Sequence, residues 1–135
     1  MPPVCITTID RARLKRVLET FSAARYDILT RFLIRELERA EVVDPAVVSP
    51  DVVTMNSRVR FRKDGAKAVE EATVVYPGHE DSILGKLSVL TPAGSALLGL
   101  AHGGKIGWLD LNGLERSLAV LDVLYQPEAN GLDLC

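Results

Sequence analysis

The segment Lys86–Gly99, which reads KLSVLTPAGSALLG, decides the fold of this chain. It predicts a strand over residues 87–90 and, directly after it, a short helix. Thr91 is placed to cap that helix, and Pro92 takes its first position, where the missing backbone N–H costs nothing. Gly99 follows the apolar end of the helix and is expected to adopt the left-handed conformation that closes it.

Two amphipathic helices are predicted upstream of this segment. Apolar residues recur at spacings of three and four over residues 8–21 and again over residues 29–40. Thr8 is expected to cap the first helix, and Asp10 lies in its first turn, where a negative charge favours the positive end of the helix dipole. The short connection makes the two helices an antiparallel hairpin. Its tip is predicted to consist of Ala24, Arg25, Tyr26 and Asp27.

Downstream of the hairpin the apolar period changes to two, which indicates strands. A proline-containing connector at residues 44–50 separates the predicted hairpin (residues 1–43) from a predicted C-terminal domain (residues 51–135). An Asn112-Gly113 turn and a bulge near Val120 are expected in the last hairpin. The whole is an α+β fold with an antiparallel sheet of about five strands around one short helix. Besides residues 87–90, strands are predicted over residues 58–62 and 69–76, around Ile106 and Trp108, and over residues 118–125.

Composition limits the classes of partner. The formal net charge is −2, which argues against binding nucleic acid through phosphate neutralisation and favours a protein partner. No apolar run approaches the length of a membrane span. Cys5 and Cys135 lie at opposite ends of the chain, in segments expected to be mobile, so no disulfide is predicted. A monomer in the cytoplasm is the expectation.

Signals for catalysis are weak. His79 and His102 each lie in a glycine-flanked loop, without an Asp or Cys at a metal-ligand spacing, and are interpreted as surface residues. Neither a nucleophile elbow nor a phosphate-binding loop is present. Trp108 on an alternating strand is expected to be a core or half-buried residue. The sequence therefore predicts no catalytic residue, no metal and no cofactor.

Four motifs together resemble a known family. They are DVVTMNSRVRF (51–61), VVYP (74–77), LSVLTPAGSALLGL (87–100) and LDVLYQPEANG (121–131). In this order and spacing they resemble the Gre family of transcript-cleavage factors, and within it the group of regulators of nucleoside diphosphate kinase. The hairpin adds only its helix-turn-helix pattern and the charged segment ELERA (36–40).

This resemblance implies a fold and a partner. The fold is an FKBP-like C-terminal domain joined to an N-terminal antiparallel coiled coil, and the partner is RNA polymerase. In Gre factors the C-terminal domain docks at the rim of the secondary channel, while a long coiled coil carries acidic residues toward the catalytic Mg²⁺. Here an arm of 14 residues reaches only about 21 Å, and Asp27 is the single carboxylate of the predicted tip. Asp27 is also suited to capping the second helix.

The implied function is a non-catalytic regulator of transcription that binds RNA polymerase and competes with Gre cleavage factors. Its effect on nucleoside diphosphate kinase is then indirect. The alternative is an interaction module that binds nucleoside diphosphate kinase directly and modulates it. A rigid helix start makes a good contact point, whereas the alternative role for each candidate is only to start the helix or form a turn. The candidate contact residues are Thr91, Pro92 and Ala93, followed by Tyr76, Asn56 and Ser57.

Overall fold

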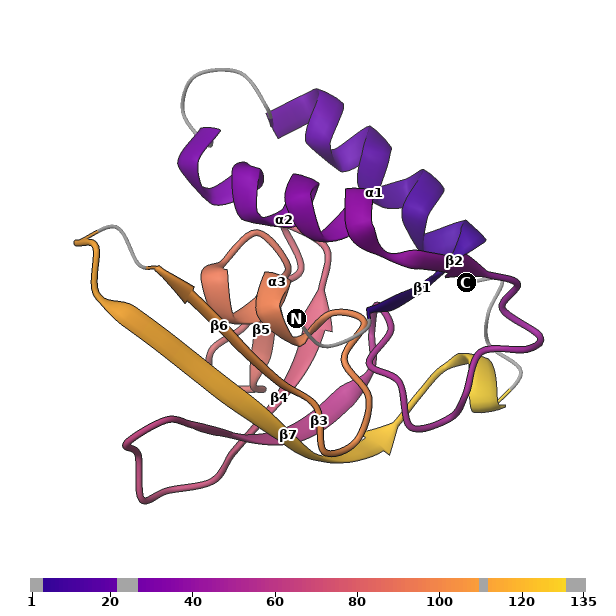
Figure 1. Ribbon diagram of the computed structural model, residues 1–135. Helices are drawn as coiled ribbons and strands as arrows, with labels where there is room; N and C mark the ends of the chain where they lie inside the picture. The colour runs from indigo at the N-terminus through magenta and orange to yellow at the C-terminus, as the bar shows by residue number, and fades with distance from the viewer. Residues whose placement is uncertain (1–3, 22–26, 110–111, 131–135) are drawn as a thin grey trace.

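The computed structural model describes residues 4–21, 27–109 and 112–130, and Figure 1 shows their arrangement. A curled sheet wraps around the short helix α3, and the two longer helices α1 and α2 lie above it. In chain order the elements are β1 (Cys5–Thr7), α1 (Thr8–Phe21), α2 (Asp27–Arg39), β2 (Glu41–Val43), β3 (Arg58–Lys63), β4 (Glu70–Val75), β5 (Lys86–Ser88), α3 (Pro92–Leu97), β6 (Lys105–Leu109), β7 (Glu115–Tyr125) and a 3₁₀ turn, η1 (Glu128–Asn130).

The main sheet has five strands in the order β5-β4-β3-β7-β6, which confirms the α+β prediction. Its predicted antiparallel character is wrong at one edge, because β5 pairs with β4 in parallel. The connection of residues 76–85 carries the chain back to a point beside Thr73, in the middle of β4, where β5 begins. Local alternation sets the faces of a strand but not its direction, so the sequence pattern did not reveal this parallel pair.

The segment quoted at the outset folds largely as its residues predict. Thr91 caps α3, Pro92 takes the first helical position, and Gly99 has a φ of +84°. The strand before α3 is shorter than predicted, since it ends at Ser88 and the next two residues lie in a buried turn. A Cβ on Gly99 would overlap the side chain of Val4, so glycine is required there for packing as well as for its φ.

The long strand β7 is irregular at the position predicted from its slipped alternation. Phe61 of β3 faces Val120, whereas Arg60 faces Asp122, so one residue of β7 is left between the two pairs. The predicted bulge is confirmed, and a second irregularity follows at Leu124. The predicted hairpin of β6 and β7 is also confirmed, with Leu109 facing Glu115 across its last pair.

A second, two-stranded sheet joins the ends of the helical segment. β1 and β2 pair in parallel, Cys5 opposite Glu41, and the backbone N–H of Cys5 donates to the carbonyl of Gly99 over 3.0 Å. The expectation that Cys5 lies in a mobile segment is therefore wrong, and residues 41–43, assigned to the end of the predicted helical hairpin, form a strand. Strands of three residues are too short for an alternation to be recognised. Cys135 lies outside the described residues.

Both longer helices pack into the same core as the sheet. Leu14 of α1 and Leu33 and Leu37 of α2 are buried in one cluster with residues of β3 and α3. The predicted apolar faces are confirmed at these positions. The predicted cap at Thr8 is wrong by one residue, because the Thr7 hydroxyl accepts from the backbone N–H of Asp10 over 3.1 Å. Within the described ranges, no helix is long and apolar enough to cross a membrane.

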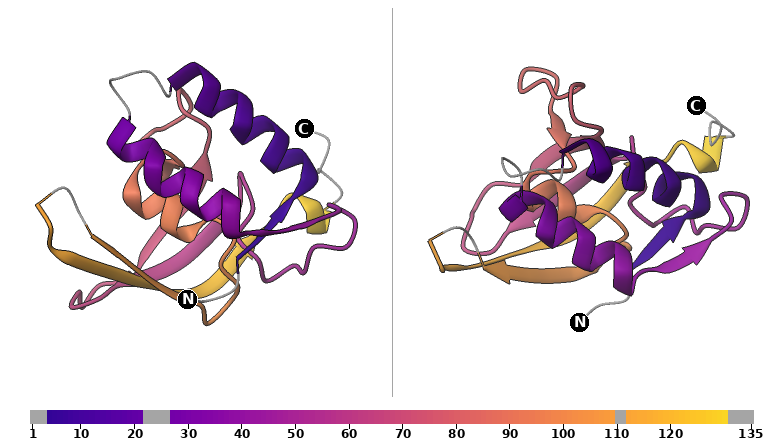
Figure 2. Two further views of the ribbon diagram at one scale, coloured as in Figure 1. Left: turned by 45° about the horizontal axis from the view of Figure 1, so that its top comes forward. Right: turned by 90° about the horizontal axis from the view of Figure 1, so that it is seen from above.

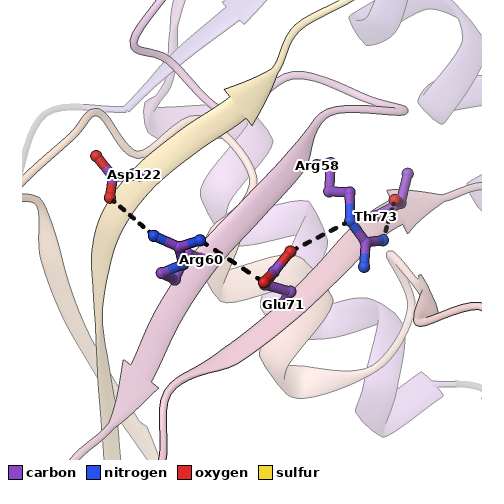
Figure 3. Close-up of polar contacts among 5 residues, drawn as sticks. All are labelled: Arg58, Arg60, Glu71, Thr73 and Asp122. Carbon is purple, nitrogen blue, oxygen red and sulfur yellow. Dashed lines mark hydrogen bonds and ion pairs between the residues drawn. The ribbon is translucent and has the colours of Figure 1, made fainter.

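Ion pairs cover the face of the sheet that is turned away from α3 (Figure 3). Arg60 of β3 lies between Glu71 of β4 and Asp122 of β7, with nitrogen–oxygen distances of 3.7 Å to each, and Arg58 is 3.6 Å from Glu71. The side chains of this ladder are 37–49% exposed. Solvent and salt therefore screen the attraction strongly.

We expect Arg60→Ala to lower the free energy of unfolding by no more than about 1 kcal/mol, since exposed ion pairs contribute little. Urea unfolding at low salt and at high salt measures the effect, which should shrink as salt is added. The exposed Arg62, on the same strand, provides the matched control through Arg62→Ala. A loss above about 2 kcal/mol, unchanged by salt, would show that Arg60 packs rather than pairs.

Candidate docking site

The start of α3 is a fixed turn. The Thr91 hydroxyl accepts from the backbone N–H of Gly94 over 3.0 Å and donates to the carbonyl of Ser88 over 2.7 Å. Ser95, one turn into the helix, donates its hydroxyl to the carbonyl of Val89 over 2.5 Å. The first bond closes the cap of α3, and the other two tie the helix to the end of β5 and the residue after it. Pro92 and Ala93 are therefore presented on a backbone that has little freedom to move.

A groove runs along this turn, between α3 and the inner side of the sheet. Its central hollow has a volume of about 440 Å³ and is lined by Leu87, Thr91, Pro92, Ala93, Trp108 and Arg116, among others. A second hollow of about 580 Å³ shares Leu87, Thr91 and Ala93 with it. A third of about 490 Å³ shares Trp108 and Arg116. We call the three together the α3 groove, which extends from the β4–β5 connection to the β6–β7 hairpin.

The lining of the α3 groove suits binding better than chemistry. Its floor is apolar, with Phe61, Leu87 and Ala93, and its rim carries charges of both signs. Trp108 is half-buried and packs against the core, as predicted. Among the described lining residues of the three hollows there is neither a histidine nor a cysteine. Among the residues that the structure describes, no three His, Cys, Asp or Glu side chains gather as a metal site.

The predicted contact residues are split between two places. Thr91, Pro92 and Ala93 line the α3 groove, whereas Tyr76 contacts Asp10 of α1 at a different site. Asn56 is exposed on a turn with a φ of +66°. Ser57 is fully buried, and its hydroxyl bonds to both the backbone and the side chain of Thr54. The structure thus corrects Ser57 to a turn-forming residue, because a buried hydroxyl already in use is not available to a partner.

The predicted hairpin tip is mostly outside the described residues. Ala24, Arg25 and Tyr26 lie there, and Asp27 is the first residue of α2. The capping role of Asp27 therefore stays a prediction.

His79 and His102 are both exposed in loops, which agrees with their interpretation as surface residues.

Asp10 lies in the first turn of α1 as predicted, but its burial was not predicted from the sequence. Asp10 is 4% exposed, and its Oδ2 accepts from the backbone N–H of Met55 over 3.0 Å. The hydroxyl of Tyr76 lies 3.5 Å from Oδ1, a long hydrogen bond. Asp10 thus links α1 to the turn before β3 and to the end of β4. The missed signal was its place on the apolar stripe, four residues before Leu14.

The environment of Asp10 raises the pKa values of two side chains, Asp10 itself and Tyr76. Burial raises the pKa of Asp10 to about 6, and the negative Glu128 adds to this, although the bonds from Met55 and Thr7 and the nearby Arg13 act in the opposite direction. Burial and the charge of Asp10 also raise the pKa of the Tyr76 phenol. Glu128 itself accepts a hydrogen bond from the Thr54 hydroxyl over 2.6 Å. This cluster, which we call the Asp10 junction, therefore joins α1, the turn at residues 54–57, the end of β4 and η1.

Comparison with known proteins shows the family of the chain. Residues 48–125 match the family described as "Transcription elongation factor, GreA/GreB, C-term", and residues 2–43 match the family "Rnk N-terminus". The chain belongs to the GreA/GreB family. The resemblance inferred from the four motifs is thereby confirmed.

Relatives within the GreA/GreB family cover almost the whole chain. The "Regulator of nucleoside diphosphate kinase" of Escherichia coli (strain K12) is 41% identical over 130 residues, which is 96% of this chain and 95% of that protein. A solved structure, "Prokaryotic transcription elongation factor GreA/GreB from Nitrosomonas europaea", is 42% identical and superposes with a TM-score of 0.69 over 90% of this chain and 99% of that chain. These relatives are named as a regulator and an elongation factor.

Relatives named as transcription elongation factor GreA match only over part of their length. "Transcription elongation factor GreA" of Chlorobium phaeobacteroides (strain BS1) is 38% identical over 73 residues, which is 53% of this chain and 46% of that protein. The similarity to such a factor therefore covers about half of each chain, whereas the similarity to the regulators continues through both helices.

Proposed function

We propose that this chain is a non-catalytic regulator of transcription that binds RNA polymerase at the rim of the secondary channel and competes there with Gre cleavage factors. The α3 groove carries the proposal. It brings the fixed turn Thr91–Ala93 to the surface beside an apolar floor, and the family resemblance implies that the C-terminal part is the docking part. In this proposal that part is an FKBP-like domain, and α1 with α2 is a short antiparallel coiled coil.

The length of the helices argues for obstruction rather than cleavage. α1 has 14 residues and α2 has 13, which correspond to about 20 Å at 1.5 Å per residue. Their packing in the common core keeps them against the body. A short arm fixed in this way can narrow a channel entrance, but it cannot carry a pair of carboxylates to a distant metal. An effect on nucleoside diphosphate kinase then comes indirectly, through transcription.

The test is binding to purified core RNA polymerase, measured by pull-down and by biolayer interferometry. We expect retention of the wild-type chain at micromolar concentration and its displacement by excess Gre cleavage factor. Ala93→Arg places a long cation in the α3 groove without removing the Thr91 cap, and should weaken binding by about tenfold or more. Ala46→Arg, at an exposed position of the 44–50 connector, is the matched control and should bind like the wild type.

No retention of the wild-type chain, or equal binding by the Ala93→Arg and Ala46→Arg variants, would overturn the docking proposal.

A second function is favoured by the name of the Escherichia coli relative. In that alternative the chain binds nucleoside diphosphate kinase directly and modulates it. Retention by immobilised nucleoside diphosphate kinase, together with no binding to polymerase, is the result that would favour it.

A further inference from the structure

The connection between β4 and β5 presents two large apolar side chains to solvent. Ile83 is 93% exposed and Leu84 is 58% exposed. Figure 2, in its right-hand view, shows this connection projecting from the body of the protein. A single exposed apolar residue needs no explanation, but two adjacent ones at the end of a projecting loop form a candidate contact for another protein.

Hydrogen bonds hold this loop in one shape. The backbones of Asp81 and Lys86 exchange two bonds, of 3.0 and 2.8 Å. The Asp81 carboxylate caps the turn from inside, since its Oδ1 accepts from the N–H of Ile83 over 2.9 Å and of Leu84 over 3.2 Å. Gly85, with a φ of +68°, accepts from the N–H of Thr73 on β4 over 2.8 Å. Because the 81–86 loop is already ordered, a partner need not order it on binding.

The 81–86 loop borders the α3 groove. Ser82, Gly85 and Lys86 line the hollow that also contains Thr91 and Ala93. A partner seated in the groove therefore reaches this loop without any rearrangement of the chain. Substitutions at Ile83 and Leu84 can test the contact cleanly, because side chains this exposed contribute little to folding.

Charge indicates what surrounds the binding pocket on the partner. Glu80 and Asp81 lie just before the apolar pair, separated from it by Ser82. Within the described part of the chain neither takes part in an ion pair. The oxygens of Glu80 accept from the backbone N–H of Gly78, at an exposed position. The negative charges of Glu80 and Asp81 are therefore available to a partner, and a surface with basic side chains complements them.

We propose that Ile83 and Leu84, which lie at one end of the α3 groove, are anchor residues that enter an apolar pocket on RNA polymerase. In this proposal basic side chains of the polymerase surround that pocket. The proposal rests on the docking function above and adds the position and chemistry of a second contact. Anchors of this kind carry a large share of the binding energy of an interface, because they are desolvated completely when the partner closes over them.

The experiment compares the double variant Ile83→Ser/Leu84→Ser with Val47→Ser, since Val47 is 72% exposed and lies in the 44–50 connector. Biolayer interferometry with core RNA polymerase measures the affinity of each. We expect the double variant to bind about tenfold more weakly or worse, and Val47→Ser to bind like the wild type. Thermal melting of both variants should match the wild type.

Two further variants test the shape and charge of the 81–86 loop. Asp81→Ala removes the acceptor for Ile83 and Leu84 and should weaken binding although both anchors are kept, because the loop must then be ordered on binding. Glu80→Lys should slow association at low salt and lose this effect at high salt, as expected for a basic rim.

The outcomes separate this inference from the docking proposal. If the double variant binds within twofold of the wild type while Ala93→Arg does not, the anchor inference is wrong and the docking proposal stands. If the wild-type chain does not bind polymerase at all, both are overturned. Weakening by the double variant with the control unchanged supports both.

Discussion

Gly94→Ala should destabilise the protein by about 3 kcal/mol. A Cβ at residue 94 would overlap the backbone carbonyl of Ser88 and lie 3.0 Å from the Thr91 hydroxyl. The same carbonyl accepts the hydrogen bonds of the Thr91 N–H and hydroxyl, so it cannot move away without releasing the cap of α3. The measurement is the free energy of unfolding in urea.

Gly65→Ala is the matched control for this substitution. A Cβ on Gly65 would meet no atom within 4 Å, but its φ is +80°, so we expect a loss of only about 1 to 2 kcal/mol from backbone strain. The Gly94 variant should also lose the α3 groove, and with it any binding to polymerase. A loss for Gly94→Ala no greater than that of the control would contradict the close contact of α3 with Ser88.

Asp10→Asn should remove a pH dependence of stability. The pKa of Asp10 is raised from 3.8 to about 6 by burial, so between these values the folded state binds more protons than the unfolded state. Stability from this group is therefore fully present below pH 4 and is lost as the pH rises through 6. The full shift corresponds to about 3 kcal/mol at 1.36 kcal/mol per unit.

We therefore expect the wild type to lose up to about 3 kcal/mol relative to Asp10→Asn between pH 4 and pH 8. The asparagine keeps an oxygen to accept from Met55, but it carries no charge to desolvate. Urea unfolding of both proteins across this range gives the difference directly, and other titrating groups cancel in it. Glu41→Gln, at an exposed acidic position, is the control and should follow the wild type. Parallel curves for wild type and Asp10→Asn would contradict the assignment.

Features that are decided within a few residues could be predicted from the sequence, whereas features that depend on contacts between distant segments could not. Thr91, Pro92 and Gly99 were placed correctly because caps and left-handed glycines are decided within a few residues. The bulge near Val120 was found because it displaces a local alternation. The parallel direction of β5 and the pairing of β1 with β2 depend on contacts between distant segments, and no local pattern reports those.

In the candidate site, too, the local features were predicted and those that depend on distant segments were not. The turn at Thr91 was predicted, but the α3 groove also needs Trp108 and Arg116 from the last hairpin, and only the folded sheet brings these beside α3. Tyr76 was predicted as a contact for a partner, whereas the structure pairs it with Asp10 inside the Asp10 junction. The interpretation of Asp10 as a helix-dipole partner was incomplete, because burial of a carboxylate depends on what packs over it.

The pairing of β1 with β2 bears on the design of chimeras within this family. The chain enters α1 from β1 and leaves α2 into β2, and these two strands lie side by side. The backbone N–H of Cys5 in β1 is in turn bonded to the carbonyl of Gly99. Leu14 and Leu33 meet residues of the sheet in a common interior. Exchanging the first 43 residues between two relatives would therefore create mismatched packing rather than transplant an independent arm. Such an exchange preserves folding only when the side chains that face the helices are transferred with them.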